Sequence, residues 1–88
     1  MGKPFSLFLS KRARQGLRKV HPAERQKILK AFDLLRINPF PSKAIQLSGG
    51  DLMRIRVGEY RILYRVFETQ LLIEVINLGH RKDIYKNL

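Results

Sequence analysis

The 88 residues carry eighteen lysines and arginines against seven aspartates and glutamates, which gives a formal net charge of +11. A hydrophobic fraction of 44% excludes an intrinsically disordered chain and is enough for one modest core. The positive charge indicates a polyanionic partner: nucleic acid is the first candidate, and an anionic membrane surface or an acidic protein are alternatives. The absence of cysteine excludes disulfides and thiolate zinc sites.

The sequence contains no apolar run that approaches the length of a membrane span. Its first ten residues are too short, and too soon followed by Lys11 and Arg12, to be a signal peptide. We therefore expect a soluble, cytoplasmic protein that makes no membrane contact and forms a single domain over residues 1–88.

The chain begins with a predicted strand and a short helix. Residues 5–9 are apolar or aromatic except for one serine, which is typical of a strand. Ser10 can cap a helix in which Ala13, Leu17 and Val20 recur at helical spacing. The other positions of this helix are mostly basic, so we expect a short helix with a charged outer surface.

A second helix is predicted from Pro22, because proline is favoured in the first turn of a helix. Ile28, Phe32 and Leu35 form its apolar stripe. The Asn-Pro-Phe-Pro run at residues 38–41 ends it, because proline lacks an amide donor and biases its predecessor toward extended geometry. The two helices are expected to form an antiparallel hairpin.

The second half of the chain predicts three antiparallel strands. They follow a connector over residues 43–47 and a Gly-Gly turn, and occupy about 52–57, 60–66 and 71–78. Gly58 and Glu59 suit a type II′ turn, and Glu68 with Thr69 the next hairpin. With a short polar C-terminal tail or helix after residue 79, the expected fold class is α+β in the order β-α-α-β-β-β.

The two-residue turn fixes the register of the first hairpin. Residues 57, 55 and 53 then pair with 60, 62 and 64, and all six are apolar or aromatic, so this face is expected to lie on the helices. On the opposite face Arg56 lies across from Arg61, and Arg54 lies one pleat from Arg56. Opposed like charges are destabilising, so this arginine face indicates an oligoanion site.

The alternative is a solvated sheet face on which Glu74 of the next strand neutralises one arginine. Arg65 continues the same pleat, but its expected neighbours, Leu52 and Leu72, indicate that its stem mainly covers apolar surface.

The terminal segment places three further candidates beyond the last strand. His80 has an ordinary pKa near neutrality, Arg81 offers bidentate phosphate contacts, and Tyr85 offers a ring on which a base can stack. The alternatives are that His80 is a solvated strand-end residue and that Tyr85 packs with Ile84 on the core.

The residue types exclude several catalytic designs. The acidic residues are scattered without paired spacing, and the chain lacks a Gly-rich phosphate loop and an evident nucleophile-base pair, so no metal or cofactor is expected. RNA offers another route, because its 2′-hydroxyl can attack the adjacent phosphate if cations stabilise the developing charge and an acid protonates the leaving oxygen.

Two stretches resemble the RelE/ParE toxin superfamily: Met53–Val66, MRIRVGEYRILYRV, and Gly79–Tyr85, GHRKDIY. The resemblance, closest to the RelE branch, implies a type II toxin that cleaves mRNA in the ribosomal A site without a metal. It also implies contact with ribosomal RNA and inhibition by a RelB-like antitoxin. The ParE branch shares the first stretch and implies an alternative, a toxin that binds DNA gyrase and cuts nothing.

The resemblance also implies residue roles. Arg61 would stabilise the transition state, Arg81 or His80 would supply the proton, and Tyr85 would stack on a nucleotide. Arg54 and Arg56 stand where relatives carry lysines, one of them proposed as general base, and an arginine is a poor base because it stays protonated. The expected catalytic residues are Arg56, Arg61, His80 and Arg81, and the expected RNA-binding residues are Arg54, Arg56, Lys82 and Tyr85.

Overall fold

The computed structural model describes residues 3–47, 49–80 and 82–85, the last range without the side chains of residues 82 and 83. It confirms the α+β class and the predicted order of elements. The strands are β1 (Ser6–Leu9), β2 (Ile45–Gln46), β3 (Leu52–Val57), β4 (Tyr60–Phe67) and β5 (Leu72–Gly79), the helices are α1 (Lys11–Arg18) and α2 (Pro22–Ile37), and two 3-10 turns, η1 (Glu68–Gln70) and η2 (Lys82–Tyr85), follow β4 and β5.

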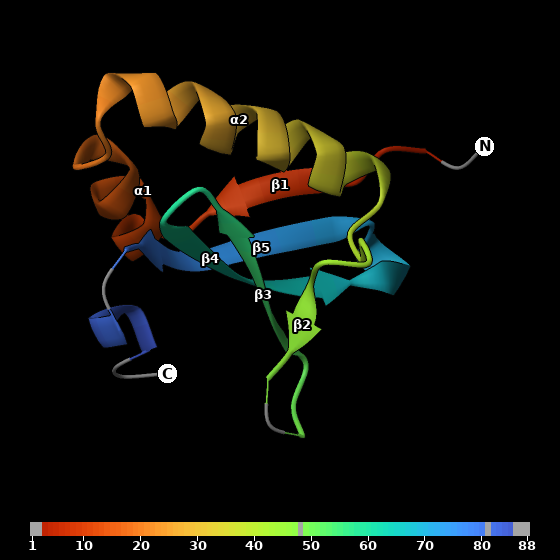
Figure 1. Ribbon diagram of the computed structural model, residues 1–88. Coiled ribbons are helices and arrows are strands. Elements are labelled where there is room, and N and C mark those ends of the chain that lie inside the picture. Colours follow the sequence, from red (N-terminus) through yellow and green to blue (C-terminus); the bar gives the residue numbers. More distant parts are fainter. Residues whose placement is uncertain (1–2, 48, 81, 86–88) are drawn as a thin grey trace.

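The described strands form one sheet in the order β1-β5-β4-β3-β2. The N-terminal strand β1 runs parallel to β5, and the other neighbours are antiparallel. Both α-helices lie on the same side of the sheet (Figure 1). The other side, which we call the outer face, carries the arginines. The segment expected to be a plain connector contains β2, which pairs Ile45 with Arg54 at the sheet edge.

The short helix α1 is fixed to β5 at both ends. The Ser10 hydroxyl accepts a hydrogen bond from the Ala13 amide at 3.0 Å, as a cap should, and donates one to the Ile76 carbonyl at 2.6 Å. Near the other end Gly16 lies against the backbone of Leu78, and a Cβ at this position would collide with the Leu78 carbonyl oxygen. Only glycine allows this close approach.

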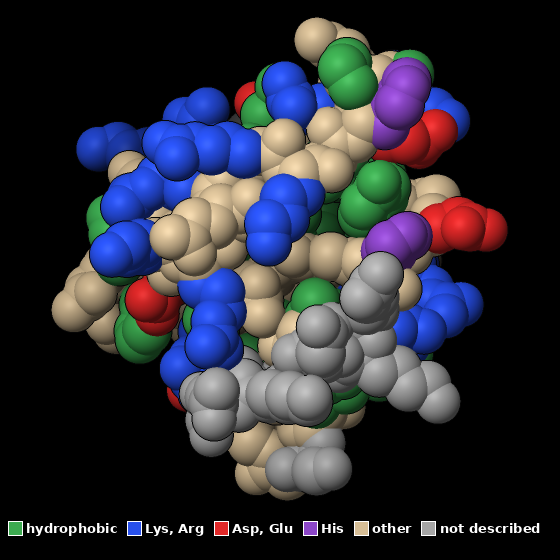
Figure 2. Space-filling model, turned by 90° about the vertical axis from the view of Figure 1, so that its left-hand side faces the viewer, with side chains coloured by type: hydrophobic (Ala, Val, Ile, Leu, Met, Phe, Trp, Pro, Cys, Tyr) green, Lys and Arg blue, Asp and Glu red, His purple; other side chains and the backbone are tan. Residues whose placement is uncertain are grey.

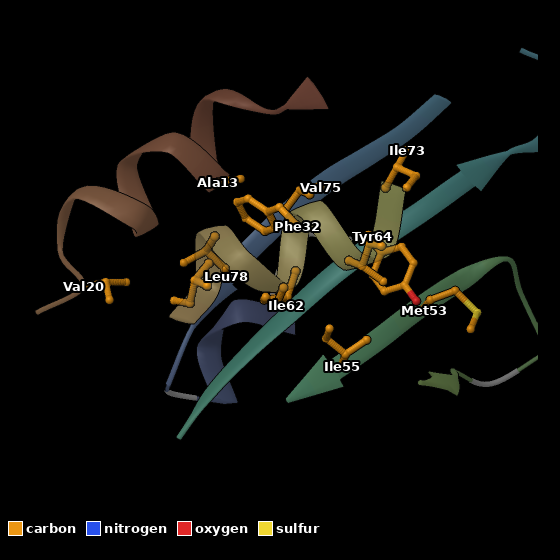
Figure 3. Close-up of a cluster of buried hydrophobic side chains, with 13 residues drawn as sticks. Ala13, Val20, Phe32, Met53, Ile55, Ile62, Tyr64, Ile73, Val75 and Leu78 are labelled. Carbon is orange, nitrogen blue, oxygen red and sulfur yellow. The ribbon is translucent and has the colours of Figure 1, made fainter. Parts of the chain in front are cut away.

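The core fills the space between the helices and the sheet (Figure 3). The predicted stripe of α2 is buried, and the apolar face of the β3–β4 hairpin packs against it. Tyr64 lies fully buried there, and its hydroxyl donates a hydrogen bond to the Pro39 carbonyl at 2.8 Å. Burial raises the pKa of Tyr64 to about 12. The fully buried side chains of this core include Ile28, Leu35, Ile55, Ile62, Tyr64, Ile73 and Val75.

One of the two predicted cross-strand neighbours of Arg65 was wrong. Leu52 pairs with it on β3, but its β5 partner is Glu74 rather than Leu72, and its Nε donates to Asp51 Oδ1 at 3.1 Å. The hairpin between β4 and β5 is longer than expected, because it contains the turn η1 and the left-handed residue Leu71 at φ 51°. The longer connection shifts the register of β5 relative to β4.

Candidate functional site

The arginine face lies where the predicted register places it. Arg56 is paired with Arg61 across β3 and β4, and Arg54 is paired with Leu63. The register follows from the turn, where Gly58 has φ 59° and no positive φ occurs at Glu59, as a type II′ turn requires. Arg56 is exposed, whereas Arg54 and Arg61 are half-buried.

Two guanidinium nitrogens on this face are buried. The Nε atom of Arg54 and the Nη1 atom of Arg61 have no hydrogen-bond partner within the described part of the chain. Leaving a buried N–H group unpaired costs about 1–3 kcal/mol, and more for a charged group. Donors held at such a cost beside a like charge indicate that an external anion pairs with them.

The C-terminal segment, expected to be a polar tail or helix, forms the turn η2, which covers part of the outer face. Ile84 is buried, and the Asn77 side-chain amide donates to the Ile84 carbonyl at 2.9 Å. Leu63 is 0% exposed although it belongs to the outer face. A register shift between β4 and β5 at Leu63 and Tyr64 pairs Leu63 with Asn77, which explains why this polar side chain lies under η2.

Tyr85 joins the arginine face through its hydroxyl. The Nη1 atom of Arg54 donates to Tyr85 Oη over a long 3.4 Å, and Tyr85 is half-buried. Arg54 and Tyr85, 31 residues apart in the sequence, are thus neighbours, and a nucleotide on this face would meet a guanidinium group and a phenol ring together.

His80 does not join the arginines through any contact among the described residues. It is exposed, and its ring stacks on Tyr60 with the ring centroids 5.3 Å apart and the planes inclined by 16°. The pleat explains this position: Gly79 lies across from Arg61, so the next residue points to the opposite side of the sheet. Sequence reasoning missed Tyr60 as the residue that holds this ring.

Arg81 and the side chain of Lys82 lie outside the described residues, so their predicted roles stay predictions. Among the residues that the structure does describe, no group of three or more His, Cys, Asp or Glu side chains is placed to hold a metal ion. Within the same residues, no helix has both the length and the apolar character to cross a membrane.

Sequence reasoning also missed Asn77, the buried amide that anchors η2. Its only signal in the sequence is a polar residue inside the otherwise apolar run ending in Leu78.

Comparisons with known proteins agree with this architecture. The family model for the ParE toxin of type II toxin-antitoxin systems, parDE, matches residues 7–85. A protein of Methanocaldococcus jannaschii named as a candidate toxin RelE1 is 28% identical over 87 residues, which cover 94% of this chain and 97% of that protein.

Solved structures give the same result. The RelBE2 toxin-antitoxin complex of Mycobacterium tuberculosis matches with a TM-score of 0.79 and 25% identity, over 89% of this chain and 99% of that one. The archaeal RelE-RelB complex of Pyrococcus horikoshii matches with a TM-score of 0.76 and 25% identity, over 90% and 97%. The chain therefore belongs to the ParE toxin family of type II toxin-antitoxin systems, and within the RelE/ParE superfamily it is a RelE-like toxin.

Proposed function

We propose that this toxin is a ribosome-dependent, metal-independent endoribonuclease that cleaves mRNA in the ribosomal A site in the cytoplasm. The observation that carries the proposal is the pair Arg56 and Arg61, with the buried Nη1 of Arg61 that has no partner in the described part of the chain. Similarity to RelE proteins favours RNA as the anion.

The proposed reaction uses the RNA's own nucleophile. The 2′-hydroxyl oxygen attacks the adjacent phosphorus, the bond from phosphorus to the 5′-oxygen breaks, and the products are a 2′,3′-cyclic phosphate and a 5′-hydroxyl. Arg61, helped by Arg56, stabilises the negative charge that builds on the non-bridging oxygens. Removing one such donor lowers rates by about 10²–10³ in well-studied enzymes.

Proton transfer is assigned to the C-terminal end. The 2′-hydroxyl must lose a proton and the 5′-oxygen must gain one. Arg56 is a poor base because a guanidinium group stays protonated. We therefore assign proton transfer to His80, with Arg81 as the alternative donor to the leaving oxygen. His80 would have to leave its stack on Tyr60 to reach a phosphate on the outer face.

The same end of the molecule would bind the substrate. We assign Tyr85 to stacking on a nucleotide, and Arg54 and Lys82 to phosphate contacts. Ribosomal RNA is the further nucleic-acid partner.

The protein partner in this proposal is a RelB-like antitoxin. Two of the matched structures are RelE bound to RelB, and both cover almost the whole of this fold. A RelB-like partner would inactivate the toxin until it is removed.

The test compares Arg61→Ala with Arg65→Ala. Both arginines lie on β4 and point to the outer face, but Arg65 is paired with Asp51 and lies outside the site. Arg61→Ala is expected to lower cleavage of ribosome-bound mRNA by at least about 10², and Arg65→Ala to leave it close to wild type. The readout is primer extension on cellular mRNA and on programmed ribosomes. Intact transcripts in cells that express the wild-type protein would refute the proposal.

The ParE family model favours a second candidate, a toxin that binds DNA gyrase without cutting nucleic acid. In that case expression would induce a DNA-damage response and spare the transcripts. The purified protein would also inhibit supercoiling by gyrase.

A further inference from the structure

Outside the arginine face, the exposed surface of α1 is the region where charges of one sign are most concentrated. Residues 11–19 hold five cations and no acid. Figure 2 shows the side of the molecule that carries α1, where lysine and arginine side chains far outnumber acidic ones. All five cations are exposed, and we call this surface the α1 basic face: Lys11, Arg12, Arg14, Arg18 and Lys19.

This surface has an energetic cost at its N-terminal end. The first turn of α1 contains Lys11 and Arg12 and no acidic residue. A cation such as Lys11 at this end opposes the helix dipole by about 0.3–1 kcal/mol, whereas Arg18 at the other end is favourable. A cation placed against the dipole, as Lys11 is, favours a partner that supplies negative charge.

The packing of α1 leaves only its polar, charged side exposed to solvent. Ala13 is 0% exposed, and Gly16 lies against the backbone of Leu78. Leu17 packs on the core as well. The apolar side of the helix is therefore used up inside the fold.

The lack of an exposed apolar side on α1 decides which class of polyanion fits it. Stable protein interfaces have an apolar or aromatic core, and helices that bind membranes insert an apolar side. The exposed side of α1 offers neither. Contacts to a phosphate backbone need only cations, and the lack of an aromatic residue for base stacking favours a double helix over a single strand.

We infer that the α1 basic face is a second nucleic-acid site, which binds the phosphate backbone of double-helical RNA, separate from the arginine face. The choice of RNA over DNA rests on the proposed function. The site would hold the toxin on folded RNA while the arginine face takes a single strand.

The experiment uses the full chain and two triple variants with the same charge loss. Lys11→Gln, Arg18→Gln and Lys19→Gln together neutralise the α1 basic face, while Arg12 and Arg14 are left in place. The control combines Lys3→Gln, Lys30→Gln and Lys43→Gln, three exposed cations elsewhere.

Binding to an RNA duplex of about 16 base pairs is measured by fluorescence anisotropy from about 50 to 200 mM salt. The α1 triple variant is expected to bind at least about tenfold more weakly at about 0.1 M salt, with a salt slope smaller by about 2 to 3. The control should keep the wild-type slope. Circular dichroism verifies folding, and if the triple variant unfolds, Lys19→Gln alone should show about one third of the slope change.

Three outcomes would overturn the inference. Both triple variants could lose equal affinity for the RNA duplex, or the protein could bind duplex DNA and not duplex RNA. The third is that the α1 triple variant keeps its affinity for RNA and loses only its binding to an acidic protein. Failure of the proposed function is distinguishable. Arg61→Ala should lower cleavage by at least about 10² but leave duplex binding intact. If the wild-type protein does not cleave mRNA but still binds duplex RNA through α1, the proposed function fails and this inference stands.

Discussion

Replacing Arg61 with methionine should make the protein more stable while it loses activity. Methionine keeps the apolar stem that lies on the sheet and removes the guanidinium group. The substitution eliminates the unpaired, buried Nη1, which costs about 1–3 kcal/mol. It also removes a repulsion with Arg56 directly across the hairpin, about 0.2–1 kcal/mol.

The expected gain in unfolding free energy is about 1–3 kcal/mol, since Arg61 is half-buried and solvent screens part of the repulsion. In a domain of this size the gain corresponds to a rise in Tm of about 5–15 °C. Thermal and urea unfolding, followed by circular dichroism at low salt without nucleic acid, measure it. Arg65→Met is the control and should gain nothing, because Arg65 is paired with Asp51. An unchanged or lowered Tm for Arg61→Met would refute the reasoning that this arginine is held at an energetic cost.

Two further predictions concern the scaffold. Tyr64→Phe should lose about 1 kcal/mol at neutral pH, because the Pro39 carbonyl loses its donor. Because the pKa of Tyr64 is raised from 10.0 to about 12, the stability of the wild type relative to this variant should be constant below pH 10 and fall by about 3 kcal/mol as the pH rises through 12. Urea titrations at each pH that show a constant difference would contradict it. Gly16→Ala should destabilise the protein by about 1–3 kcal/mol, because its Cβ meets the Leu78 backbone. Gln15→Ala, on the exposed side of α1, should be neutral or slightly stabilising in the same unfolding assay.

The part of the site on the β3–β4 hairpin was predictable because its determinants are local. Gly58 fixes the turn, the turn fixes the register, and the register fixes which side chains face each other. The alternation of apolar and basic residues then decides which face packs on the helices. The amino-acid sequence alone was therefore enough to pair Arg56 with Arg61.

The C-terminal part was not predictable, because its position depends on contacts between distant residues. The register shift opposite Leu63 moves Asn77 beneath η2, and no local pattern shows where a strand will bulge. The sequence offered packing of Ile84 on the core as an alternative, but no local pattern placed Ile84 over Asn77 on the outer face. His80 was expected beside the arginines because it follows the last strand directly, but the pleat turns it toward Tyr60.

The energetics of the arginine face bear on how the proposed RNA target and antitoxin would both bind there. The buried donors on Arg54 and Arg61 have no partner among the described residues and lower the stability of the free protein, so a partner that supplies acceptors there recovers that free energy on binding. In the proposed function an RNA phosphate in the transition state would be one such partner, and an antitoxin that covers the face with carboxylates or carbonyl oxygens would be another. The variant that stabilises the free toxin, Arg61→Met, should therefore weaken both interactions, because it removes the donor that each of them would pair.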